Sequence, residues 1–81
     1  MMGYDQKVEA VKRRLIELGA RVSMRRRQLA HREKTYARVR GRGDLYTLVR
    51  PAITKHFPEA YMTSATGGEG AFDLTFSLDP R

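Results

Sequence analysis

The chain contains no cysteine, and it has only three prolines among its 81 residues. The lack of cysteine excludes disulfides, thiolate metal sites and a cysteine nucleophile, and it is typical of proteins kept in a reducing compartment. No apolar run approaches the roughly 18–20 residues of a membrane span, and the N-terminal residues lack the apolar core of a signal peptide. We therefore expect a cytoplasmic protein that makes no contact with a membrane.

Clustered catalytic or metal-binding residues are also lacking. The nine acidic residues are scattered singly, and the two histidines, His31 and His56, stand without ligand or triad spacing. The glycine-rich stretch 66–70 lacks the Lys-Ser/Thr ending of a phosphate-binding loop and precedes a predicted strand. We expect no enzymatic activity, no cofactor and no metal ion.

The length and the charge are more informative. Residues 1–81 suffice for a single small domain. Its hydrophobic core is small, so a partner subunit would help to stabilise the fold. The net charge is +7, but residues 1–43 carry +9 and residues 44–81 carry −2. The segment 21–42 holds nine basic residues and one acid, Glu33. Such self-repulsion costs stability unless an anionic partner relieves it.

The apolar residues of the first half recur in steps of three and four, which predicts a long amphipathic helix within residues 1–39. The series is Tyr4, Val8, Val11, Leu15, Leu18, Val22, Leu29, Tyr36 and Val39. We define the part from Val8 to Val22 as the apolar seam, and a homodimer would bury it.

Gly19 weakens this helix and leaves two alternatives open. It could end a first helix of residues 4–18, with Ser23 capping a second one. Alternatively, Ala20, Val22 and Met24 could be one face of a short strand. We favour helix on both sides of Gly19, bent or broken at that residue.

The second half predicts a short helix and then a hairpin. The glycines of 40–43 favour a turn, and Asp44 is a good N-cap for a helix over 44–57, interrupted near Pro51. Residues 71–78 alternate strictly, with Phe72, Leu74, Phe76 and Leu78 on one face, and 60–78 form an antiparallel β-hairpin. The predicted fold class is therefore α+β, with a long N-terminal helix, a second short helix and a C-terminal hairpin.

The basic segment is the candidate binding site. On a continuous helix Lys7, Arg14, Arg21, Arg25 and Arg32 would form one stripe beside the apolar seam. Arginine suits phosphate contacts, and a tyrosine within the segment could stack on a base. The predicted nucleic-acid-binding residues are Arg14, Arg21, Arg25, Arg26, Arg27, Arg32, Lys34, Tyr36, Arg38, Arg40 and Arg42.

These features favour a small non-enzymatic protein that binds DNA or RNA, mainly through phosphates and without sequence readout. The alternative is a basic interaction module that docks on an acidic protein surface. It would act as an inhibitor or accessory subunit of a larger nucleic-acid-processing machine, for example as a mobile-element protein that acts on the nucleic-acid enzymes of its host. The two hypotheses differ in what neutralises the arginines, nucleic-acid phosphates or the carboxylates of one protein.

Overall fold

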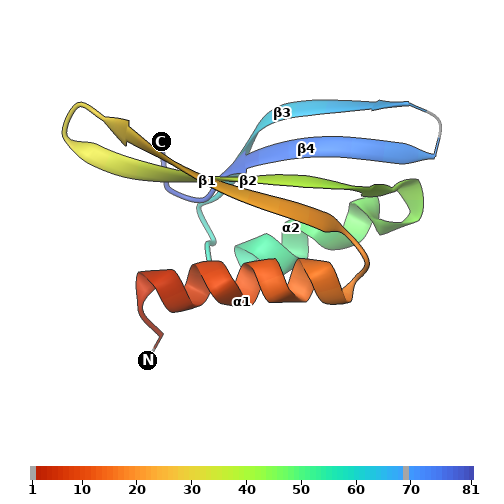
Figure 1. Cartoon of the computed structure of the whole chain (residues 1–81), viewed down its shortest axis with the longest axis horizontal. Helices are drawn as coiled ribbons and strands as arrows, with labels where there is room; N and C mark the ends of the chain where they lie inside the picture. Colours follow the sequence, from red (N-terminus) through yellow and green to blue (C-terminus); the bar gives the residue numbers. More distant parts are fainter. Residues whose placement is uncertain (1, 69) are drawn as a thin grey trace.

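The computed structural model describes residues 2–68 and 70–81, which form a four-stranded antiparallel sheet with two α-helices on one side (Figure 1). Along the chain these are α1 (Tyr4–Glu17), β1 (Arg21–Leu29), β2 (Arg32–Arg42), a 3-10 turn (Gly43–Leu45), α2 (Tyr46–Thr54), β3 (Tyr61–Gly68) and β4 (Ala71–Ser77). The strand order in the sheet is β1-β2-β4-β3.

The predicted fold class is wrong, because the N-terminal helix ends at Glu17 and residues 21–42 form two strands. Gly19 has a φ of +102°, a conformation that L side chains rarely adopt. The amide of Gly19 donates to the carbonyl of Ile16, and the amide of Ala20 donates to that of Leu15. This Schellman arrangement satisfies the last carbonyls of α1 and turns the chain away from the helix axis.

The β1–β2 hairpin replaces the predicted second half of the helix. Its two-residue turn is Ala30–His31, with Ala30 at a positive φ of 26°, and Leu29 pairs with Arg32 across it. The turn contains none of the Gly, Asn or Asp residues that usually mark such a hairpin, so the sequence carries no turn signal here. The strand alternative for Ala20, Val22 and Met24 matches the structure better than the favoured helix did.

The predicted turn at 40–43 is also displaced, because β2 continues to Arg42. Gly41 has a packing role instead: a Cβ placed on it would lie 3.0 Å from Cζ of Phe72. Glycine therefore allows the Phe72 ring to pack directly under β2. The following helix is shorter than the predicted 44–57, since α2 ends at Thr54 and contains Pro51 within it.

The last two strands lie within the predicted 60–78 segment, but they are half of one sheet and not a separate terminal hairpin. β4 is a central strand, paired with β3 on one side and with residues 36–42 of β2 on the other. A register shift between Met62 and Ser64 bends β3. The predicted loop includes Glu69, which lies outside the described residues.

The core lies between the helices and one face of the sheet. Val11 and Leu15 of α1, Val39 of β2, and Phe76 of β4 are all fully buried there. Most of the apolar seam therefore packs on its own sheet, and the predicted reason for dimerisation through it is removed. Leu78 extends the contact by donating its amide to the carbonyl of Thr35 in β2.

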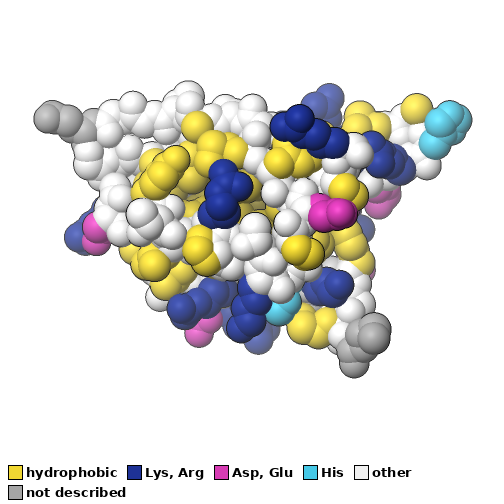
Figure 2. Space-filling model, turned by 180° about the vertical axis from the view of Figure 1, so that it is seen from behind, with side chains coloured by type: hydrophobic (Ala, Val, Ile, Leu, Met, Phe, Trp, Pro, Cys, Tyr) yellow, Lys and Arg dark blue, Asp and Glu magenta, His cyan; other side chains and the backbone are white. Residues whose placement is uncertain are grey.

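Some apolar surface stays exposed on α2, where Tyr46 and Leu48 are 49% and 44% exposed. Figure 2, drawn from behind, shows hydrophobic side chains across the middle of that view, with Lys and Arg side chains both among them and at the edges. Among the helices of residues 2–68 and 70–81, none is long and apolar enough to cross a membrane.

Candidate functional site

Strand alternation sorts the basic segment onto the two faces of the sheet. The side chains of Ala37 and Val39 enter the core, so their neighbours in β2 point to the opposite side, which neither α1 nor α2 covers (Figure 1). We call this side the open face. In β1, Arg25 pairs with Tyr36 and Arg21 pairs with Arg40, and residues paired across two strands point to the same side of the sheet. The open face thus receives nine of the predicted residues: Arg21, Arg25, Arg27, Arg32, Lys34, Tyr36, Arg38, Arg40 and Arg42.

Two predicted residues lie elsewhere. Arg14 is in the last turn of α1, on the helical side of the molecule. Arg26 points to the same side, where it forms an ion pair with Asp5 of α1 and a longer one, at 3.8 Å, with Glu33. A helical stripe containing Arg14, Arg25 and Arg32 does not exist, because these residues belong to three different elements.

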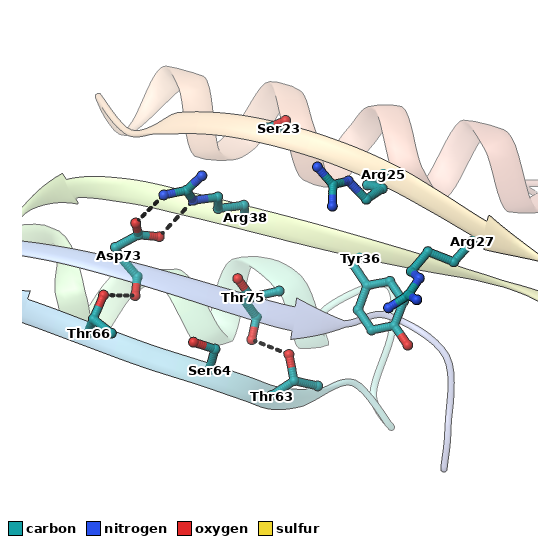
Figure 3. A pocket seen from close by; sticks show the side chains of 10 residues that line it. All are labelled: Ser23, Arg25, Arg27, Tyr36, Arg38, Thr63, Ser64, Thr66, Asp73 and Thr75. Atoms are coloured by element: carbon teal, nitrogen blue, oxygen red, sulfur yellow. Dashed lines mark hydrogen bonds and ion pairs between the residues drawn. The ribbon is translucent and has the colours of Figure 1, made fainter.

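The open face is hollowed into a depression of about 700 Å³ (Figure 3). One half of its lining comes from β1 and β2 and carries Arg25, Arg27, Tyr36 and Arg38. The other half comes from β3 and β4 and is formed mainly by four hydroxyl side chains, those of Thr63, Ser64, Thr66 and Thr75. The depression therefore has a cationic side and a neutral, hydrogen-bonding side.

Asp73 of β4 is the one acidic residue that the structure describes in this depression. Arg38 binds it through two hydrogen bonds, from Nε at 3.0 Å and from Nη2 at 2.6 Å. These bonds hold the pKa of the Asp73 carboxyl below its ordinary value, and the charge of Arg40 acts in the same direction. The pair is accordingly ionised at neutral pH, and its two charges cancel.

The other arginines of the open face are largely without carboxylate partners. Arg42 lies 3.5 Å from Asp44, at the end of β2. Within the described parts of the chain, five others have no carboxylate oxygen within 4.0 Å: Arg21, Arg25, Arg27, Arg32 and Arg40. All five are exposed. Solvent ions or an anionic ligand would relieve their mutual repulsion.

Lys34 is on the open face by register but is only 6% exposed. Its ammonium group donates to the hydroxyl of Tyr61 at 3.1 Å and lies 5.5 Å from the centre of that ring. The guanidinium of Arg81 lies over the same ring at 4.6 Å. Lys34 thus belongs to a cluster with the C-terminal residues, and it is less available to a ligand than the exposed arginines.

This cluster predicts the order in which two tyrosines titrate. The hydrogen bond from Lys34 lowers the pKa of Tyr61, whereas burial raises the pKa of Tyr4. We expect Tyr61 to deprotonate at a lower pH than Tyr4 in a titration followed by ring-carbon NMR. A Lys34→Met variant should raise the pKa of Tyr61 toward 10.0 and leave that of Tyr4 unchanged. An unchanged Tyr61 titration in this variant would contradict the assignment.

The hydroxyl side of the depression was not predicted from the sequence. For Thr75 the signal was present, because it alternates with buried Leu74 and Phe76 in the predicted strand. For Thr63 and Ser64 it was not, since the register shift in β3 turns both toward the open face against simple alternation. Figure 2 shows mostly white surface along the upper rim near the β3–β4 turn and dark blue side chains farther along it.

The open face combines exposed guanidinium groups, a half-buried aromatic ring and hydroxyls, and guanidinium groups are suited to contacts with anionic oxygens. In the residues that the structure describes, no group of three His, Cys, Asp or Glu side chains is placed to hold a metal ion. Comparison with protein-family models, curated proteins and solved structures gave no match to this chain.

Proposed function

We propose that this protein is a non-enzymatic nucleic-acid-binding protein whose ligand lies on the open face of the sheet. The observation that carries the proposal is the five exposed arginines of β1 and β2 without carboxylate partners among the described residues. Guanidinium groups at the surface are well suited to phosphate oxygens, which they can contact through paired hydrogen bonds.

The regular spacing of the strands supports a polymer over a small anion. Alternate residues of one strand face the same side about 6.5–7 Å apart, and neighbouring strands are about 4.8 Å apart. Arg25 and Arg27 are separated in this way along β1, and Arg38 and Arg40 along β2. Successive phosphates of a nucleic-acid strand are separated by similar distances, so several can be neutralised at once. We also propose that the protein acts in the cytoplasm, on the ground that the chain contains no cysteine.

The test is a fluorescence-anisotropy titration of the full chain with labelled single-stranded RNA, single-stranded DNA and duplex DNA at several salt concentrations. Engagement of the five unpaired arginines predicts that log affinity falls against log salt with a slope of about −3.5 for single strands, or about −4.5 for a duplex. The dissociation constant at near-physiological salt should lie below about 100 μM.

Binding weaker than about 100 μM to all three ligands, at near-physiological salt, would overturn the proposal. The open face would then be better explained by an acidic protein surface as its partner. Binding that does not weaken with salt would equally contradict it, because phosphate contacts release counterions.

A further inference from the structure

We infer that the ligand of the open face is a single strand, with its phosphates over β1 and β2 and one of its bases stacked on Tyr36. This inference rests on the proposed function and assigns a ligand class to the same site. Three observations carry it: the division of charge across the face, the position of Tyr36, and the hydroxyls beyond it.

The division of charge is incompatible with a duplex lying along the face. In the order of the strands across the sheet, the basic residues lie on β1 and β2. The described residues that β4 and β3 contribute to the depression are threonines, a serine and Asp73. A duplex presents two rows of phosphates, separated by a groove about 6 or 12 Å wide. If one row lay on the arginines, the other would lie over β4 and β3, where Asp73, already paired with Arg38, and neutral hydroxyls supply no positive charge. A single strand has one row of phosphates, which the basic side chains of β1 and β2 alone can neutralise.

Tyr36 stands at the boundary between the two halves. It is the aromatic side chain in the lining of the depression, paired across the sheet with Arg25 of β1 and Ser77 of β4 (Figure 3). Its side chain is half-buried, so the ring is held by its neighbours while part of it remains accessible. A base extending from a phosphate on β1 or β2 toward β4 would meet this ring first, and every base has a face that can stack.

The hydroxyls lie where the edges of further bases or the sugars would fall. Thr63 donates to the carbonyl of Thr75 at 3.3 Å, and Thr66 donates to that of Asp73 at 3.5 Å. These bonds orient the two side chains, which line the depression, and each hydroxyl oxygen can still accept a further hydrogen bond. Ser64, between them on β3, lines the same surface. Neutral hydroxyls can accept or donate toward base and sugar groups without favouring one nucleotide strongly.

The experiment compares three ligands of equal length: a single strand, the same strand with abasic sites, and its duplex. Wild-type protein should bind the single strand at least about fivefold more tightly than the abasic strand, since stacking on one aromatic ring contributes that much or more. Tyr36→Ala should remove most of this preference while leaving the salt slope unchanged, because no phosphate contact is lost. Tyr36→Phe, which keeps the ring, should behave like the wild type.

The outcomes separate the two proposals. If the abasic strand and the duplex bind as tightly as the single strand, or if Tyr36→Ala keeps the preference for bases, the single-strand inference is wrong and the phosphate-binding function stands. If none of the ligands binds with salt dependence, both fail. If circular dichroism shows that Tyr36→Ala does not fold, Tyr36→Leu takes its place, because leucine retains apolar packing but cannot stack on a base.

Discussion

Reversing the charge of Arg25 and Arg27 together, by Arg25→Glu and Arg27→Glu, is expected to weaken nucleic-acid binding by more than about a hundredfold at 0.1 M salt. Each single-strand phosphate contact contributes about fivefold in affinity at that salt, so losing two accounts for about 25-fold. The added carboxylates repel the phosphates and increase the loss. Both side chains are exposed on the open face, so the fold should be kept.

The matched control reverses the same number of charges on the helical side, by Arg13→Glu and Arg14→Glu. Both side chains are exposed on α1, away from the open face. This variant should lose less than about fivefold in affinity, because at the Debye length of about 10 Å in 0.1 M salt distant charges act weakly. Arg26 is left unchanged in both proteins, since its ion pair with Asp5 links β1 to α1. Equal losses in the two variants would mean that the net charge of the protein, and not the open face, determines binding.

Affinity for nucleic acid is expected to increase when Asp73, the acidic residue of the depression, is replaced by a neutral side chain. Asp73→Asn would release Arg38 from its two hydrogen bonds and remove the negative charge beside Arg40. Affinity for a single strand should rise about fivefold, with a salt slope about 0.7 steeper, as one more phosphate becomes neutralised. The titration used for the wild type measures both quantities, and a lower affinity for Asp73→Asn would show that Arg38 must be held by its partner to bind.

The largest effect on stability is expected from Phe76→Ala. The ring of Phe76 is fully buried between the sheet and the helices, and the guanidinium of Arg50 in α2 lies 5.4 Å from its centre. Removing such a ring lowers the free energy of unfolding by about 3–5 kcal/mol, because transfer free energy is lost and a cavity is left. A domain of this length has only roughly 4–12 kcal/mol in total, at about 0.05–0.15 kcal/mol per residue. The loss is therefore at least about a quarter of the total, and at the lower end of that range it is as large as the whole stability of the domain.

Urea denaturation followed by circular dichroism measures this loss. Ile16→Ala is the control, because Ile16 is 53% exposed on α1 and alanine favours helix, so its change should stay within about 0.5 kcal/mol. If Phe76→Ala does not fold at all, Phe76→Leu should still show a measurable shift of the denaturation midpoint. A midpoint equal to that of Ile16→Ala in either variant would mean that the core is not where the structure places it.

Composition and local pattern alone determined several properties of this protein. The excess of arginine in residues 21–42 is a property of the sequence, but it did not separate the nine predicted residues of the open face from Arg14 and Arg26, which lie on the helical side. The apolar spacing of Val8, Val11 and Leu15 predicted the buried stripe of α1, and the alternation of Phe72, Leu74 and Phe76 predicted the buried face of β4. These patterns are local, because each depends on the period of a single helix or strand.

Only the tertiary structure decided whether residues 21–42 are helix or strand, and therefore which arginines share a face. The spacing of three and four residues favoured a helix even though Arg25 and Arg32 stand at positions of the apolar series, and the sequence offered no turn signal at Ala30–His31 to favour a hairpin. The choice is made by β4, whose backbone groups pair with β2, and by the helices that cover Ala37 and Val39. Once the segment is a strand, the alternation of its side chains separates Arg26 from Arg25 and Arg27. Pairing partners distant in sequence determine that outcome, and no pattern within the segment contains them.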